Sequence, residues 1–198
     1  MRLPSDERGL ANLWLRVRHR RDRRIRTDLT PAERLLLARL ACDVRRRGGA
    51  AFVELGSYLG ASACFIAAGL HRAGGGGLLT CVDTWRNDAM SEGPRDTWGE
   101  FHANVRPWER FIRTVRATSA EAAAAFAGPV DFLFVDADHD YEAVRADIAA
   151  WFPRLSPGAT VAFHDVFYFP GVRRAVDEFV APRARTGGGE RNLYWARF

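Results

Sequence analysis

The chain has 198 residues, 47 % of them hydrophobic, which is enough for one well-packed domain but short for two. It contains no run of 18 uncharged apolar residues, and its first residues lack the order of charged, apolar and small residues found in a signal peptide. Cys42, Cys64 and Cys81 are widely spaced and form no C-x-x-C motif. We therefore expect a cytoplasmic protein with reduced thiols and no membrane span.

The basic charge is concentrated near the N-terminus. All 29 basic residues are arginine, so lysine chemistry is excluded. Residues 1–47 hold 14 Arg against 6 acidic residues, a net charge of +8, whereas residues 48–198 hold 15 Arg against 18, a net charge of −3. The run Arg16–Arg26 has the composition of a nucleic-acid contact, but we favour a solvated helix face or a contact with an acidic neighbour.

Two helices are predicted before the first strand. Apolar residues at helical spacing predict an amphipathic helix from Ser5 to about Ile25. The sequence Thr30-Pro31-Ala32-Glu33 is typical of a capping box and predicts a second helix that ends near Arg47, before two glycines. We assign residues 1–48 to N-terminal helices that cap a site or contact another subunit, and residues 49–198 to one domain.

The stretch from Ala50 to Leu70, AAFVELGSYLGASACFIAAGL, predicts a strand, a glycine loop and a helix. Such a loop admits a ligand close to the backbone, beside the free N–H groups of the helix. The loop ends without the Lys-Ser/Thr of a P-loop and does not fit G-x-G-x-x-G. Because Glu54 disfavours a phosphate, we expect hydroxyls or a cationic amine on a nucleotide-like ligand. The alternative is a tight turn without a ligand.

The later elements alternate between strands and helices. Strands are predicted at residues 78–82, 111–116, 131–135 and 160–163, and helices at 119–126, 141–152 and 172–180. A terminal antiparallel strand at 192–198 is expected after a glycine turn at 187–189. This order predicts a doubly wound α/β domain with a mainly parallel sheet. Residues 84–107 are longer than an ordinary connection, which indicates a lid, although a helix packed on the sheet explains their second half.

Polar residues follow every predicted parallel strand, at the sheet edge where open α/β folds bind ligands. Asp83 follows the second strand, and Thr118 and Ser119 follow the third. Asp136, Asp138 and His139 follow the fourth strand, and His164 and Asp165 follow the fifth. Asp83 has the position of an acid that accepts two ribose hydroxyls, which also occurs in dinucleotide-dependent dehydrogenases.

Three motifs in this order, VELGSYLGAS, CVDTW and DFLFVDADHDYEAVRADIAAWFPRLSPGATVAFHDV, resemble class I S-adenosylmethionine-dependent methyltransferases. The resemblance covers Phe52 to Gly171 and is closest to the branch of metal-dependent catechol, caffeoyl-CoA and antibiotic sugar O-methyltransferases. It implies a Rossmann-like fold with a mostly parallel seven-stranded sheet and an antiparallel C-terminal strand.

The resemblance also implies a cofactor site. It places Glu54, Gly56, Ser57, Tyr58, Gly60 and Ser62 around the methionine and ribose of S-adenosylmethionine. Asp83 would hold the ribose diol, Trp85 would flank the adenine, and Ser119 would lie at the adenine edge. For Tyr58, packing of a loop residue against its neighbours is an equal alternative.

The ends of the fourth and fifth strands carry the implied chemistry. In the family, the residue matching Asp136 is a metal ligand, and a general base stands three positions later, where this chain has His139; that residue could instead cap a helix. His164 and Asp165 stand where the family has Asp-Asn or Glu-Asp, so Asp136, His164 and Asp165 are the candidate metal ligands. An imidazole shifts preference from Mg²⁺ toward Mn²⁺, Fe²⁺, Ni²⁺ or Zn²⁺. Alternatively, His164 is the base and Asp165 orients it.

We therefore expect an S-adenosylmethionine-dependent O-methyltransferase that acts on a hydroxyl of a phenolic or sugar-bearing small molecule, such as a natural product. A nucleic-acid methyltransferase is the first alternative, but the Asn/Asp-Pro-Pro-Tyr/Phe motif of amino-group methylation is absent after the fourth strand. A non-catalytic cofactor-binding protein is the second alternative. Nicotinamide-dependent redox chemistry needs a different glycine pattern.

Overall fold

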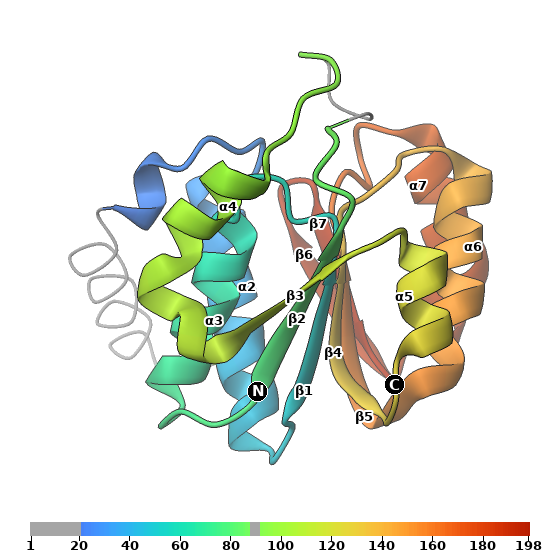
Figure 1. The fold of residues 1–198 in the computed structure, drawn as a ribbon. Coiled ribbons are helices and arrows are strands. Elements are labelled where there is room, and N and C mark those ends of the chain that lie inside the picture. Colours follow the sequence, from blue (N-terminus) through green and yellow to red (C-terminus); the bar gives the residue numbers. More distant parts are fainter. Residues whose placement is uncertain (1–20, 88–91) are drawn as a thin grey trace.

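A seven-stranded sheet runs through the molecule, with helices on both of its faces (Figure 1). The computed structural model describes residues 21–87 and 92–198. The strands are β1 (Ala51–Leu55), β2 (Leu78–Asp83), β3 (Ile112–Arg116), β4 (Val130–Val135), β5 (Leu155–Phe163), β6 (Thr186–Glu190) and β7 (Leu193–Arg197). Their order is β3-β2-β1-β4-β5-β7-β6, with β1 to β5 parallel and β7 antiparallel to both of its neighbours. The doubly wound prediction is confirmed, and the strand order reverses between β1 and β4.

Among the described residues, α-helices cover both faces of the sheet (Figure 1). One face carries α2 (Pro31–Arg46), α3 (Ala61–Arg72) and α4 (Trp98–Val105), and the other carries α5 (Ser119–Ala125), α6 (Tyr141–Trp151) and α7 (Pro170–Ala175). Short 3-10 turns lie at Asp22–Arg24, Arg106–Phe111, Phe152–Arg154 and Ala181–Arg183, and a π turn at Val176–Val180. Each face has its own cluster of buried apolar side chains, because the strands are apolar on both sides. No helix of the described residues is long and apolar enough to cross a membrane.

Helix α2 is part of the main core and begins as predicted. The Thr30 hydroxyl accepts the Glu33 N–H, and the Glu33 carboxylate accepts the Thr30 N–H at 2.6 Å, which is a complete capping box. Helix α2 packs against α3 so closely that a Cβ at Gly69 would lie 2.3 Å from the Ala38 carbonyl oxygen. Most of the predicted helix from Ser5 to Ile25 lies outside the described residues, and its described end forms the turn at 22–24.

The glycine turn predicted at residues 187–189 is wrong, because these glycines lie inside β6. They pair with β7, where the Trp195 ring packs against the strand: a Cβ at Gly188 would lie 3.1 Å from the Trp195 indole nitrogen. The hairpin turns instead at Arg191 and Asn192, and Arg191 has a left-handed φ of 55°. The space needed by the tryptophan ring therefore explains Gly188, whereas a Cβ at Gly187 or Gly189 would meet backbone oxygens of β7 at 2.8 and 2.9 Å.

Candidate active site

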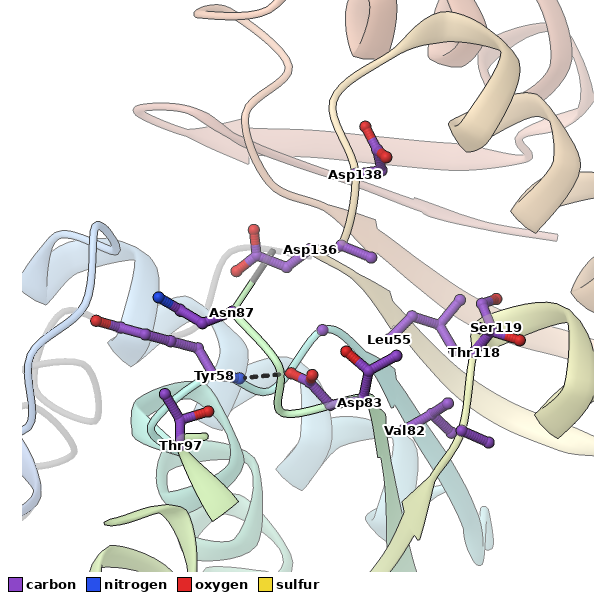
Figure 2. Close-up of a pocket in the computed structure, with 14 residues that line it drawn as sticks. Leu55, Tyr58, Val82, Asp83, Asn87, Thr97, Thr118, Ser119, Asp136 and Asp138 are labelled. Atoms are coloured by element: carbon purple, nitrogen blue, oxygen red, sulfur yellow. Dashed lines mark hydrogen bonds between the residues drawn. The ribbon is translucent and has the colours of Figure 1, made fainter. Parts of the chain in front are cut away.

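The glycine loop between β1 and α3 is fixed by the carboxylate of Asp83. One carboxylate oxygen accepts the N–H groups of Ser57 at 2.7 Å and Tyr58 at 2.8 Å, and the other accepts the Trp85 N–H at 2.6 Å. Figure 2 shows the bond between Tyr58 and Asp83. Gly56 has a φ of 80°, and a Cβ there would lie 2.1 Å from the Asp136 carbonyl oxygen. Only glycine therefore allows the β1 loop to lie against the end of β4.

A cavity of about 280 Å³ opens above this loop at the carboxyl ends of the strands (Figure 2). It is lined by Leu55, Gly56, Tyr58, Val82, Asp83, Thr84, Asn87, Thr97, Ala117, Thr118, Ser119, Asp136, Ala137 and Asp138. Five of the predicted site residues are among these: Gly56, Tyr58, Asp83, Ser119 and Asp136. The Tyr58 hydroxyl donates to Glu92 at 2.7 Å, and the Ser119 hydroxyl accepts the Trp151 indole N–H at 2.9 Å.

Four other predicted cofactor residues, Glu54, Ser57, Gly60 and Ser62, support the loop from behind the cavity. Glu54 is fully buried and accepts the Ser57 hydroxyl at 2.6 Å, while its other oxygen has no partner among the described residues. Burial raises the pKa of Glu54 to about 7, although hydrogen bonds from Ser57 and Ser62 oppose the shift. A Cβ at Gly60 would lie 2.7 Å from Val105, so this glycine lets α3 approach α4.

The Trp85 indole ring is buried and is not among the residues that line the cavity, and its predicted contact with an adenine stays a prediction. The ring is fully buried and meets Trp98 edge-on, with centroids 4.6 Å apart, and Phe101 at 4.8 Å. The ring packs here because α4 covers this end of the sheet with apolar side chains, as the helix alternative for residues 84–107 predicted. The cavity also uses Asn87 and Thr97 from this segment, which no sequence motif indicated.

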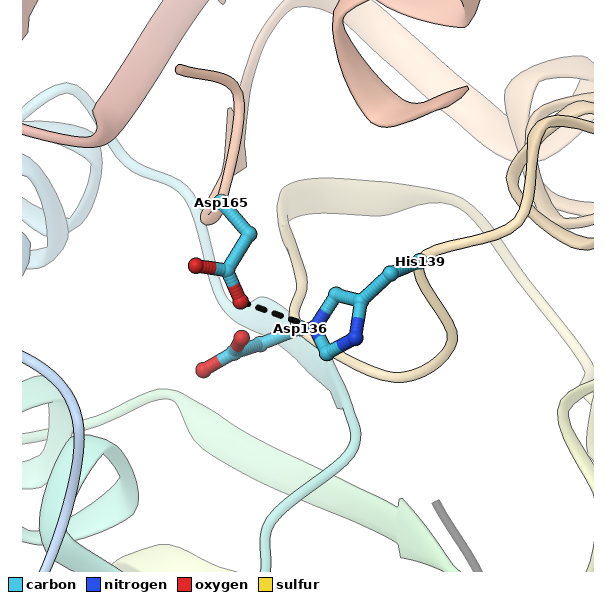
Figure 3. Close-up of side chains that lie close together, drawn as sticks. All are labelled: Asp136, His139 and Asp165. Carbon is cyan, nitrogen blue, oxygen red and sulfur yellow. Dashed lines mark ion pairs between the residues drawn. The ribbon is translucent and has the colours of Figure 1, made fainter. Parts of the chain in front are cut away.

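Asp136, His139 and Asp165 converge beside the cavity, at the ends of β4 and β5 (Figure 3). His139 Nε2 lies 2.8 Å from Asp165 Oδ2, and the imidazole stacks on Phe169 with ring centroids 4.0 Å apart. The hydrogen bond to Asp165 raises the pKa of His139 above its usual 6.5. Asp140, not His139, is the N-cap of α6, which leaves the imidazole side chain available to the cluster.

His164 is buried behind these carboxylates. Its Nδ1 lies 3.2 Å from Asp136 Oδ1 and 3.3 Å from Asp165 Oδ2, and its Nε2 lies 3.8 Å from Glu33 Oε2. Burial opposes the charge of this imidazole, but the two aspartates outweigh burial and raise its pKa to about 11. A protonated imidazole is neither a metal ligand nor a base.

The residues that could hold one metal ion differ from the predicted set. One ligand atom from each of Asp136, His139 and Asp165 lies within 4.8 Å of the others, and His164 is not in this group. In the observed set of possible metal ligands, His139 takes the place that the sequence analysis assigned to His164. His164 instead donates to the carboxylates of Asp136 and Asp165. Asp165 has a left-handed φ of 62°, which turns its carboxylate back toward both histidines.

A second cavity of about 790 Å³ adjoins this cluster. It is lined by Asp28, Thr30, Glu33, His139, His164, Asp165, Phe167, Tyr168, Phe169, Arg191 and Asn192. The three consecutive aromatic residues are exposed by 62, 79 and 40 %, respectively. Exposed neighbouring rings on one short loop form an apolar surface for a ligand.

A family model described as a methyltransferase domain matches residues 53–166, more than half of the chain. The chain therefore belongs to this methyltransferase-domain family. The curated Sinorhizobium fredii protein y4gI, which is uncharacterized, is 38 % identical over 123 residues. That match covers 57 % of this chain but only 13 % of y4gI, so the chain corresponds to a small part of this relative.

Two solved structures share the fold over nearly the whole chain. The O-methyltransferase TomG from Streptomyces achromogenes, involved in tomaymycin synthesis and solved with S-adenosylmethionine, is 15 % identical, with a TM-score of 0.66 over 98 % of this chain and 99 % of its own. CalS11, a TDP-rhamnose 3'-O-methyltransferase of calicheamicin biosynthesis, is 18 % identical, with a TM-score of 0.65 over 100 % of this chain and 88 % of its own. At these identities the likeness establishes the fold.

Proposed function

We propose that this enzyme transfers the methyl group of S-adenosylmethionine to a hydroxyl of a small molecule. The observation that carries the proposal is the position of Asp136. This residue lines the cavity above the glycine loop and also belongs to the cluster with His139 and Asp165. A methyl donor in the first cavity and a hydroxyl in the second would therefore meet at one acid–base cluster.

The first cavity suits the donor in shape and charge. The Asp83 carboxylate borders it and keeps about one lone-pair site on Oδ1 for a ribose hydroxyl, beside the three backbone N–H groups it already accepts. Thr118 and Ser119, at the end of β3, line the part assigned to the adenine. Asp136 supplies negative charge near a sulfonium, and among the described residues that line the cavity there is no basic side chain that would suit a pyrophosphate.

His139 is the proposed base. Asp165 holds its Nε2 proton, so Nδ1 carries the lone pair that accepts the hydroxyl proton of the acceptor. The hydroxyl oxygen attacks the methyl carbon in line with sulfur, the carbon–sulfur bond breaks, and S-adenosylhomocysteine leaves as a neutral thioether. Most of the rate enhancement would come from alignment of the oxygen, the carbon and the sulfur.

Asp136 and Asp165 also fit a divalent cation. Their carboxylate oxygens lie within 4.8 Å of each other and are donors for Mg²⁺ or Mn²⁺, and an ion held by these two residues leaves His139 free to act as the base. When bound, such an ion would lower the pKa of the acceptor hydroxyl and stabilise the resulting oxyanion.

The second cavity is the proposed acceptor site. Its volume of about 790 Å³ accommodates a ring system or a glycoside, and Phe167, Tyr168 and Phe169 offer faces on which a phenolic or sugar ring can stack. Thr30 and Glu33 line its opposite side, which supports the prediction that the N-terminal helices cap the site. TomG, which is involved in tomaymycin synthesis, and CalS11, which acts in calicheamicin biosynthesis, support this acceptor class.

The test is transfer of a labelled methyl group from S-adenosylmethionine to a panel of phenols, nucleotide sugars and nucleic acids. We expect a methylated small-molecule product. The variant His139→Ala should lower the rate of methyl transfer by a factor of about 10² to 10⁴ and leave the affinity for S-adenosylmethionine unchanged. His102→Ala, which removes a histidine on the exposed side of α4, is the matched control and should retain activity. Transfer to nucleic acid alone, or full activity of His139→Ala, would contradict the proposal.

A further inference from the structure

The turn between β6 and β7 reaches the acid–base cluster through Asn192, a residue that no sequence motif singles out. Asn192 is only 4 % exposed. Its Nδ2 donates to Asp165 Oδ1 at 2.6 Å, and its Oδ1 accepts the N–H groups of Phe167 at 2.7 Å and Tyr168 at 3.2 Å. One amide thus binds the carboxylate beside His139 and the aromatic loop of the second cavity.

The backbone of Asn192 is held as firmly as its side chain. Its N–H donates to Glu33 Oε1 at 2.6 Å, and its carbonyl oxygen accepts the Val166 N–H at 3.2 Å. Glu33 is fully buried and anchored in the capping box of α2. Asn192 is therefore fixed by two separate parts of the chain, residues 165–168 and Glu33, and this gives its amide a defined orientation.

The two oxygens of Asp165 have different partners. Oδ1 accepts Asn192 Nδ2, while Oδ2 faces His139 Nε2 and His164 Nδ1. Without the amide, the carboxylate could rotate about its Cβ–Cγ bond and lose the orientation that holds the imidazole. An aspartate at position 192 could still accept from the loop N–H groups, but it could not donate to Asp165.

We propose that Asn192 is a positioning residue for methyl transfer: it fixes the Asp165 carboxylate against His139 and holds the aromatic loop of the acceptor cavity in place. This inference rests on the proposed function for its kinetic consequence. It makes the β6–β7 hairpin part of the catalytic arrangement, although neither strand contributes a group that reacts. Replacement of this amide should change turnover without changing cofactor binding, because Asn192 does not line the first cavity.

The kinetic test compares Asn192→Asp with Asn192→Ala, and uses Glu190→Gln on the same hairpin as the matched control. We expect both Asn192 variants to lower kcat between about 10- and 100-fold with S-adenosylmethionine affinity unchanged, and the control to match wild type. In an Asp165→Ala background, Asn192→Ala should have no further effect on kcat. Wild-type kcat in Asn192→Asp, or an equal loss in both backgrounds, would overturn the proposal.

A second readout separates this proposal from the assigned reaction. The ¹⁵N signals of the His139 ring report its tautomer and hydrogen bonding without any substrate. We expect Asn192→Asp to shift these signals and Glu190→Gln to leave them unchanged. If wild type methylates no hydroxyl but the signals shift, the proposed function fails and the positioning contact stands. Unchanged signals in Asn192→Asp would overturn the positioning contact whatever the reaction is.

Discussion

The buried carboxyl group of Glu54 should make the stability of this enzyme depend on pH near neutrality. Its pKa is raised from 4.5 to about 7 because the group is fully buried at the end of β1. The folded state then holds a proton that the unfolded state releases, so the stabilisation is complete below pH 4.5 and is lost as the pH rises through 7. A shift of this size corresponds to about 3 kcal/mol.

The perturbation that isolates this effect is Glu54→Gln, since an amide resembles the protonated acid but does not titrate. Urea unfolding of both proteins at pH 5, 6, 7 and 8, without cofactor, gives the difference in free energy of unfolding at each pH. We expect the free energy of unfolding of the variant, relative to that of wild type, to rise by up to about 3 kcal/mol between pH 5 and pH 8. Other titrating groups, including His164, cancel in this difference. A difference that stays constant with pH would refute the assignment of a raised pKa to Glu54.

Four further outcomes follow from the site. Asp83→Ala should weaken S-adenosylmethionine binding about 10-fold or more in calorimetry, because the glycine loop loses its anchor; unchanged affinity would contradict the assigned ribose site. Trp85→Phe should lower the melting temperature but leave that affinity within about 2-fold, since the ring packs in the core; a large loss of affinity would support an adenine contact. Gly56→Ala should lower the melting temperature more than Gly158→Ala, because both have φ near 80° but only the first Cβ meets backbone; equal shifts would argue against a tight loop. Treatment with EDTA should lower turnover and added Mg²⁺ or Mn²⁺ should restore it, whereas full turnover in EDTA would remove the cation from the mechanism.

The mainly parallel sheet and five residues of the first cavity were predictable because they depend on local patterns. Apolar runs followed by polar residues identified the strand ends, and parallel strands bring those ends to one edge. Asp83 and Asp136 were therefore expected to lie near each other, and both line the cavity.

The features that the sequence did not reveal depend on contacts between distant segments. The glycines of β6 were interpreted as a turn because the Trp195 ring beside Gly188 and the backbone beside Gly187 and Gly189 belong to the neighbouring strand. Asn192 lies 27 residues from Asp165 in sequence, and no spacing rule connects the two. The charge on His164 likewise follows from its burial between carboxylates, which the His-Asp pair alone does not indicate.

The most direct test of the account is calorimetric titration of the protein with S-adenosylmethionine and, separately, with NAD. We predict that S-adenosylmethionine binds at one site per chain, that S-adenosylhomocysteine competes with it, and that NAD gives no binding heat. Binding of NAD without binding of S-adenosylmethionine would contradict the assignment of the cavity above the glycine loop as a methyl-donor site.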